Sequence, residues 1–330
     1  MENNQLDEIV SEIETPKVLI VPMRPGEPLS EAGRAVLLKH LEKLRKNEQL
    51  AREGNVEGVH DMRVATRRLR AGLKVLEKTV YKAEQVGKFR RSLRTLANAL
   101  GDTRDSDVLL EHLERYAATL PSEKLVEIEP LRQSITDRRE AGQRHILRTL
   151  DNKATAKLFN KLEAFLTTPS EGLRKSPSDK NEAAPLLVRH FSGSVIWRCY
   201  EEVLAYETKL PANIEVLHRL RVACKRFRYT LEFFEEALPG QAKPLIQQLV
   251  KAQDHLGTLH DHQVAIERVE RLEKQHPDDL ALVDYATLRA KERDQLYSQF
   301  ETLWLALSGA DFRLSLAAIL SGEEVANPKS

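Results

Sequence analysis

The 330-residue sequence has little cysteine, little aromatic character and almost no net charge, and each shortage excludes a class of protein. Two cysteines, Cys199 and Cys224, are too few for a disulfide framework, which favours a reducing compartment. Lysine and arginine total 51 against 50 acidic residues, so the net charge is +1. A chain that is neutral as a whole is not a general nucleic-acid coat, and any anion site on it requires a local concentration of charge.

Targeting and membrane signals are missing from the same inventory. The N-terminal stretch MENNQLDEIVSEIE is acidic and lacks the basic and apolar regions of a signal peptide. The longest strongly apolar runs, such as VLIV and SLAAIL, are far shorter than the roughly 20 residues that cross a bilayer. We therefore expect a cytoplasmic protein that has no membrane partner.

Helical periodicity is the main pattern that the sequence does contain. Charged residues make up 31% of the chain and aromatic residues 5%, which is typical of soluble, mainly helical proteins. Apolar residues recur every three or four positions in 34–51, 59–78, 86–100, 104–118, 123–149 and 154–166, and again in 186–207, 213–237, 242–256, 260–275, 279–307 and 311–320. Residues 168–184 are rich in Pro, Ser and charge and are interpreted as a linker.

Two sequence blocks occur twice, in the same order. VHDMRVATRRLR at 59–70 matches LHRLRVACKRFR at 217–228, an offset of 158, and ALGDTRDSDV at 99–108 matches HLGTLHDHQV at 255–264, an offset of 156. Matched blocks at nearly one offset indicate an internal duplication. We predict an all-α fold of two helical bundles about a pseudo-two-fold axis, with repeats at 29–167 and 185–322, an N-terminal arm at 1–28 and a C-terminal tail at 323–330.

The first block of each copy places like charges on one helix face. At about 100° per residue, one apolar stripe contains Met62, Ala65, Leu69, Leu73 and Leu76, and its counterpart contains Leu217, Leu220, Cys224, Phe227 and Leu231. The opposing cationic stripes contain His60, Arg63, Arg67, Arg70 and Lys74 in one copy and His218, Arg221, Lys225 and Arg228 in the other. If the copies face each other, these stripes line a shared channel or cleft.

Phosphate chemistry suits these stripes better than an ordinary solvated surface does. Solvated helix faces usually mix acids and bases, but Arg67 and Arg221 have no acid three or four residues away. The planar guanidinium group grips phosphate bidentately, and the first stripe runs for about 20 Å, which matches a repeating polyanion. The alternative is that acids on other helices neutralise the stripes.

Residues beside the stripes have further candidate roles. Arg94 and Lys251 precede the two glycine-containing blocks and could join the anion site, whereas Asp105 and Asp261 are expected to cap a helix or pair with an arginine. For His60 and His218, donation to phosphate and orientation of a neighbouring arginine both remain open.

Three alternatives to anion binding fit the sequence less well. A metal-dependent phosphohydrolase would use the doublets at 60–61 and 260–261, but neither doublet occurs in the other copy. A metal site on His255, His260, Asp261 and His262 is disfavoured because His260 and His262 would point about 200° apart on a helix. Single-strand nucleic-acid binders interleave aromatic residues, and only Tyr229 lies at a stripe edge. We expect no cofactor, no metal and no catalytic residue.

The doubled blocks, with LGDTRD and LGTLHD, resemble the CHAD family, the conserved histidine α-helical domain, over about residues 29–322. The resemblance implies two pseudo-symmetric four-helix bundles and a basic central channel that binds inorganic polyphosphate. The positions that carry over are His60, Arg63, Arg67, Arg68, Arg70, His218, Arg221, Lys225, Arg226 and Arg228. Arg68 and Arg226 lie off the stripe centres and are expected at the other bundle or a rim.

Two departures qualify this resemblance. Many family members carry a triphosphate-tunnel enzyme domain, for which residues 1–28 are too short, so we expect a non-catalytic, stand-alone binding module. Lys225 stands where the first copy has Arg67, which keeps the charge and loses the planar fork. The expected partners are inorganic polyphosphate, polyphosphate granules or polyphosphate-metabolising enzymes; another polyanion, either nucleic acid or a phosphorylated small molecule, is the alternative ligand.

Overall fold

The computed structural model describes residues 21–77, 79–174, 185–210, 213–273 and 280–322. Within these ranges the chain forms α-helices, short 3-10 helices and three isolated β-bridges, which confirms the predicted all-α class. The predicted arm up to residue 20, residues 175–184 of the predicted linker and the predicted C-terminal tail lie outside the described residues.

The helices fall before and after the undescribed part of the linker. The first set is α1 Leu29–Lys46, α2 Glu48–Arg52, α3 Val56–Leu76, α4 Ala83–Ala117, η1 Ser122–Ile128, α5 Glu129–Leu150 and α6 Lys153–Thr167. The second set is α7 Val188–Leu204, η2 Glu207–Lys209, α8 Ile214–Phe234, η3 Glu235–Ala237, α9 Ala242–Glu273, α10 Leu280–Ser308 and α11 Ala310–Ser321.

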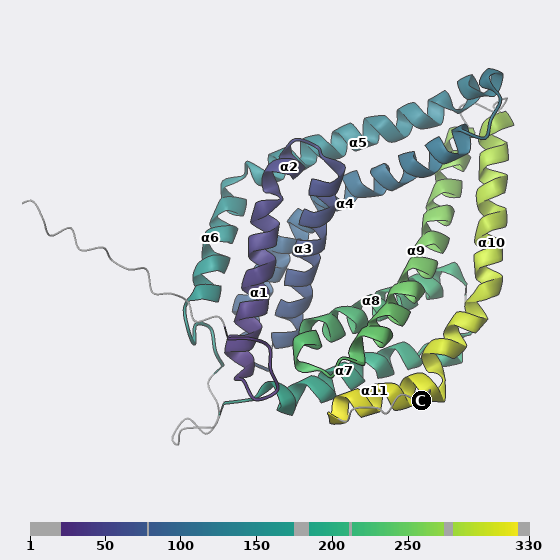
Figure 1. Ribbon diagram of the computed structural model, residues 1–330. Coiled ribbons are helices and arrows are strands. Elements are labelled where there is room, and N and C mark those ends of the chain that lie inside the picture. Colours follow the sequence, from purple (N-terminus) through teal and green to yellow (C-terminus); the bar gives the residue numbers. More distant parts are fainter. Residues whose placement is uncertain (1–20, 78, 175–184, 211–212, 274–279, 323–330) are drawn as a thin grey trace, which may run out of the picture.

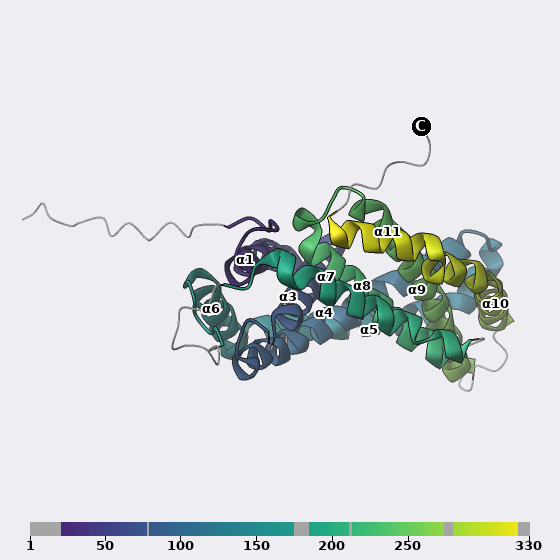
Figure 2. The ribbon, with the colours of Figure 1, turned by 90° about the horizontal axis from the view of Figure 1, so that it is seen from below.

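The helices are arranged as the four sides of a frame. In Figure 1, α1, α3 and α6 form one side, α4 and α5 run together across the top, α9 and α10 form the opposite side, and α7, α8 and α11 lie below. Figure 2 shows the same arrangement from below, with α7 and α11 nearest the viewer. Helices α3 and α8, which carry the repeated block, pack against each other where the two sets meet.

Part of the predicted N-terminal arm belongs to the fold. The side chain of Met23 is buried, with 1% of its surface exposed. The backbone N–H groups of Val188 and Arg189, at the start of α7, donate to the carbonyls of Glu27 and Pro25, each at 3.0 Å. The N-terminal end of the second set of helices is therefore fastened to the segment that precedes α1.

Helices α3 and α8 begin in the same way. The side-chain oxygen of Asn55 accepts the Gly58 N–H at 2.9 Å, and that of Asn213 accepts the Val216 N–H at 3.0 Å. Asparagine is a favoured N-cap because its short side chain satisfies a backbone donor of the first turn. Both helices are 21 residues long, and the two caps are separated by the same 158 positions as the repeated block (213 − 55).

Two predicted helix boundaries are wrong. Segments 86–100 and 104–118 form the single 35-residue helix α4, and segments 242–256 and 260–275 form most of the 32-residue helix α9. The gaps between these apolar segments contain Gly101 and Gly257, and glycine lowers helix propensity by about 1 kcal/mol. Both glycines instead lie inside continuous helices, against a neighbouring arginine.

Two apolar cores hold the frame together. The main core contains all ten residues of the predicted apolar stripes on α3 and α8, each of which is buried. A second core joins the far ends of α4, α5 and η1 to α9 and α10, where the rings of Tyr116 and Tyr285 lie 5.1 Å apart. The two sets of helices are therefore joined at two separate places.

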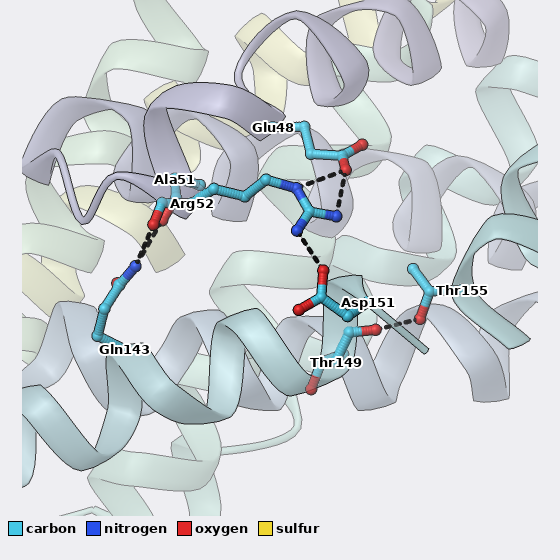
Figure 3. Close-up of polar contacts among 7 residues, drawn as sticks. All are labelled: Glu48, Ala51, Arg52, Gln143, Thr149, Asp151 and Thr155. Carbon is cyan, nitrogen blue, oxygen red and sulfur yellow. Dashed lines mark hydrogen bonds and ion pairs between the residues drawn. The ribbon is translucent and has the colours of Figure 1, made fainter. Parts of the chain in front are cut away.

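Polar contacts fix the short helix α2 on α5 (Figure 3). The Arg52 guanidinium contacts Glu48 at 2.9 Å and Asp151 at 2.6 Å. The amide of Gln143 donates to the carbonyls of Ala51 and Arg52, at 3.0 and 2.8 Å. The turn that leads into α3 is thereby positioned from the outer helix.

One described stretch, Leu282–Ser321, is long and apolar enough to cross a membrane by length and composition, with a mean hydropathy of 1.5 and 28% of its apolar window buried. The prediction from short apolar runs misses this stretch, because Asp311 and Arg313 interrupt it. Gly309 has an extended conformation between α10 and α11, and α11 packs Phe312 and Leu316 into the main core.

Gly58→Ala is expected to lower the free energy of unfolding by about 1 kcal/mol. A Cβ at this position would lie 2.4 Å from Leu50 Cβ and 2.8 Å from the Leu50 carbonyl carbon, so α2 and α3 must separate. Overpacking costs about 1–3 kcal/mol and outweighs the gain of about 1 kcal/mol in helix propensity. Urea denaturation measures the difference.

Gly240→Ala is the matched control, because a Cβ there meets nothing within 4 Å. Its unfolding free energy should stay within about 0.5 kcal/mol of the parent. If Gly58→Ala proves as stable as this control, the close contact between α2 and α3 is wrong.

Candidate functional site

An arginine of each repeated block lies over a glycine of the next long helix. Arg63 of α3 donates from Nη1 to the Gly101 carbonyl at 3.2 Å and pairs with Asp105 at 2.7 Å. Arg221 of α8 lies over Gly257 of α9. Its Nη2 and Nε atoms are 3.5 and 3.6 Å from the point where a Cβ would lie if residue 257 had a side chain. Because glycine has no side chain, the guanidinium group reaches the surface of the helix backbone. The expected pairing of Asp105 with an arginine is confirmed.

A polar cavity of about 640 Å³ opens between α3, α4, α8 and α9. Its charged or titratable lining residues are His60, Arg63, Arg67, Arg104, Asp105, Asp254, His218, Arg221, His260 and Asp261. Five members of the predicted binding set, His60, Arg63, Arg67, His218 and Arg221, are therefore brought together from the two repeated helices.

Several cations in or next to this cavity form no ion pair with a carboxylate in the described part of the chain. Among the described residues, no ion pair is formed by Arg67, Arg70, Arg221 or Lys225. The Nε atoms of Arg67, Arg70 and Arg221 are buried and, within the described part of the chain, have no hydrogen-bond partner. The interaction that Arg67 does make is with an aromatic ring, because its guanidinium lies 5.1 Å from the centre of Tyr229.

Burial and mutual repulsion lower the pKa values of these cations. Burial, followed by the charges of Arg221, Arg67 and Arg63, lowers the pKa of Lys225 from 10.5 to about 7. Lys225 is therefore partly unprotonated at neutral pH. Burial is also the main cause that lowers the pKa of Arg67, with smaller contributions from neighbouring arginines. Lowered pKa values of this kind mean that the charged forms of Arg67 and Lys225 are poorly compensated in the fold, although Asp105, Asp254 and Asp261 also line the cavity.

Burial and nearby cations also shift the pKa values of three histidines and one aspartate that line the cavity. Burial lowers the pKa of His60, His218 and His260, with added repulsion from Arg104, Arg221 and the His218 ring respectively. Burial raises the pKa of Asp261, although the nearby Arg221 opposes this shift. All four groups thus favour their neutral forms more than they would in water.

The basic surface continues along α3 beyond the cavity. Burial first, and then the charges of Arg90 and Arg94 on α4, lower the pKa of Arg70. Arg90 pairs with Glu77 at 2.9 Å, whereas Arg94 forms no ion pair among the described residues. Of the predicted set, Arg70 and Arg94 therefore form a second cationic group next to the first.

The remaining predicted residues lie elsewhere or are neutralised. Arg68 pairs with Glu232 at 3.2 Å and lines a separate small cavity, so it contacts α8 as its off-centre position suggested. Lys74 pairs with Glu77 at 2.7 Å, Arg226 with Glu202 at 2.6 Å and Arg228 with Glu232 at 3.5 Å. Lys251 is exposed on α9. Nearby acids therefore neutralise Arg68, Lys74, Arg226 and Arg228, as the alternative to anion binding expects.

Arg104 and His260 line the cavity although the predicted set omitted them. Each follows its glycine by three residues, one helical turn along the face that the glycine opens. The His260 ring lies 4.7 Å from that of His218. Spacing from the repeated glycine was the signal that would have identified both residues.

The histidines considered as metal ligands diverge. His255 Nε2 lies 2.9 Å from the Leu296 carbonyl, His260 faces the cavity, and His262 Nε2 lies 3.5 Å from Glu292 on α10. Across the described ranges, no three His, Cys, Asp or Glu side chains converge as metal ligands would.

Known proteins share this sequence and this arrangement of helices. The model of the CHAD domain matches residues 35–270. Two uncharacterized proteins of Mycobacterium tuberculosis, MT2285 of strain CDC 1551 / Oshkosh and Rv2226 of strain ATCC 25618 / H37Rv, are each 27% identical over 260 residues. The matched region is 77% of this chain and 47% of each relative, so the chain spans about half the length of these curated relatives.

Two solved structures have a similar fold. The crystal structure of the CHAD domain from the plant Ricinus communis superposes with a TM-score of 0.64 at 26% identity, over 91% of this chain and 96% of that one. PptA from Streptomyces chartreusis gives a TM-score of 0.65 at 15% identity, over 84% and 99%, a likeness of fold alone. Since the family model covers most of the sequence and a CHAD domain shares the helical arrangement, this chain belongs to the CHAD family.

Proposed function

We propose that this chain is a non-catalytic binding module for inorganic polyphosphate, and that the polymer occupies a basic channel formed by the cavity between α3 and α8. The observation that carries the proposal is the set of cations without carboxylate partners, Arg67, Arg221 and Lys225 among the described residues, around about 640 Å³ of polar space. A phosphate chain supplies the missing negative charge and acceptor oxygens without adding apolar surface.

We further propose that the channel is made by two duplicated units related by a pseudo-two-fold axis near the contact of α3 with α8. Three details support this. The N-caps Asn55 and Asn213 are equivalent, the capped helices have equal lengths, and each unit places an arginine over a glycine. In this arrangement each unit contributes one wall of the site.

A ligand without bases fits the site better than a nucleic acid does. Single-strand binders present aromatic faces on which bases stack. Tyr229 is 7% exposed, and the guanidinium groups of Arg67 and Arg228 lie 5.1 and 4.9 Å from its ring centre. None of the described residues that line the cavity is Phe, Tyr or Trp. The proposed partners are therefore polyphosphate itself, and through it granules or polyphosphate-metabolising enzymes in the cytoplasm.

Long-chain polyphosphate is expected to bind more tightly than single-stranded DNA of equal charge, because the site offers cations and no stacking surface. Five neutralised phosphates would lower the affinity about 100-fold between roughly 50 and 200 mM salt, through counterion release. Fluorescence anisotropy competition at several salt concentrations measures both effects. Equal or tighter binding of DNA would refute polyphosphate as the ligand.

Replacing Arg67 and Arg221 with Gln is expected to weaken polyphosphate binding by at least about 100-fold, since two lost charge-assisted contacts of about 1.5–3 kcal/mol each total about 3–6 kcal/mol. The fold should persist, because neither side chain has an ion-pair partner in the described structure that would be left buried.

The matched control is Lys74→Gln with Arg226→Gln, which removes the same two charges from pairs outside the cavity. Its affinity should change by no more than about threefold, in line with weak surface pairs. Equal losses in the two double variants would mean that net charge matters and the cavity does not.

Polyphosphate binding is expected to weaken as the pH rises from 7 to 9. The pKa of Lys225 is about 7 in the free protein, and a bound polyanion raises it, so binding takes up a proton above pH 7. The pKa values of His60, His218 and His260 are lowered below 6.5 in the free protein, so any proton uptake by these rings on binding begins at lower pH than that of Lys225. Calorimetry in two buffers of different ionisation enthalpy measures the uptake.

Lys225→Arg keeps the charge and should remove the proton uptake between pH 7 and 9. Undiminished uptake in this variant would assign the proton to another group.

A further inference from the structure

A second polar cavity of about 640 Å³ lies between the C-terminal end of α4 and the middle of α9 and α10. It is separate from the central one, because successive histidines of α9 face different spaces: His260 lines the central cavity and His262 lines this one. Of the described lining residues, Thr258 alone is common to both. The repeated cationic helices α3 and α8 contribute no described residue to it.

Two deeply buried polar side chains line this cavity with unmet hydrogen-bonding capacity. His262 is 5% exposed, and its Nδ1 is buried without a hydrogen-bond partner among the described residues. Arg289 is 9% exposed, and the same holds for its Nε. Glu292 lies 3.0 Å from Arg289 and 3.5 Å from His262, and its buried Oε2 makes no hydrogen bond within the described structure. Leaving such groups unpaired is costly, so a polar occupant would stabilise them.

The charge around this cavity favours an anion. Arg115 of α4 and Arg289 of α10 both line it, and Glu292 is the single carboxylate in its described lining. The ring of His112 lies 6.1 Å from that of His262. Burial, and then repulsion from Arg289 and Arg115, lowers the pKa of His262 to about 4, which places both guanidinium charges near this ring. Side chains that can donate N–H groups, namely His112 and Arg115 of α4, His262 of α9 and Arg289 of α10, thus line one space.

The size and walls of the cavity indicate more than inorganic phosphate. Pockets of about 300–1,000 Å³ hold small organic ligands. Apolar wall area comes from Leu288 and Leu296 and from the buried ring of Tyr116. A phosphate group, with three acceptor oxygens and up to two negative charges, matches donors that converge from three helices.

We propose that this cavity between α4, α9 and α10 binds a small phosphomonoester, with its phosphate between Arg115 and Arg289 and its organic part against Leu288 and Leu296. Nucleoside monophosphates and sugar phosphates share this chemistry. The site is independent of the proposed polyphosphate channel, which lies on the other face of α9.

Isothermal titration calorimetry of the full chain with AMP, ribose 5-phosphate, inorganic phosphate and adenosine tests the proposal. AMP or ribose 5-phosphate should bind with a stoichiometry of one, inorganic phosphate more weakly, and adenosine not at all. The relative affinities of AMP and ribose 5-phosphate distinguish a nucleotide site from a sugar phosphate site. No binding of either phosphomonoester, or equal binding of adenosine and AMP, would overturn the proposal.

Two single variants separate the cavities. Arg115 is exposed and forms one long ion pair, 3.8 Å from Glu111, so Arg115→Ala should fold normally. It should weaken phosphomonoester binding by about tenfold, the loss expected for one charge-assisted contact, and leave polyphosphate binding unchanged. Arg104→Ala, in the central cavity, should weaken polyphosphate binding and leave phosphomonoester binding unchanged.

Phosphomonoester binding that survives Arg115→Ala, or that Arg104→Ala removes, would overturn the assignment to this cavity. Loss of the proposed polyphosphate function alone would leave the phosphomonoester result intact, because the two titrations use different ligands and different variants.

Discussion

Arg63 and Arg221 reach the centre of the molecule because Gly101 and Gly257 lie opposite them. A Cβ at either position would lie 3.5–4.0 Å from the guanidinium group, in ordinary contact, so a side chain longer than that of alanine would compete with the arginine for this space. In each copy, therefore, the first repeated motif supplies the arginine and the second motif supplies the glycine over which its guanidinium group lies. The central cavity, the position of Asp105 and the close approach of α3 to α4 and of α8 to α9 all depend on this fit.

Crowding of cations at this point is unfavourable for the folded chain by itself. Burial and like charge lower the pKa values of Arg67, Arg70 and Lys225, which means that their charged forms are destabilised in the fold. The apolar stripes of α3 and α8 offset this cost by packing into one core. A polyanion that binds only the folded state would add stability that rises with the logarithm of its concentration relative to its Kd, so on the proposed function the ligand also stabilises the fold.

Sequence periodicity identified the helices, the buried stripes and five of the cavity residues, because these depend on spacing within one helix. It did not reveal which acids pair with members of the predicted binding set. Glu232 on α8 is far in sequence from Arg68, and Glu202 on α7 lies on another helix than Arg226. Glu77 follows Lys74 by three positions and was within reach of sequence reasoning. Apolar periodicity also divided α4 and α9 into separate segments at Gly101 and Gly257, because the arginine that covers each glycine comes from another helix and is not visible in the local sequence.

Because α4 and α9 are long, the two apolar cores hold them at widely separated points. At 1.5 Å per residue, a helix of 35 residues extends for about 52 Å, so a small rotation at its base would swing its tip by several ångströms. The aromatic contact of Tyr116 with Tyr285 ties that tip to α10, while α3 and α8 are joined at the opposite corner. Contacts at both ends of α4 restrict such a rotation. On the proposed function, the spacing of α3, α4, α8 and α9 around the central cavity therefore sets the width that is available to a polyphosphate chain.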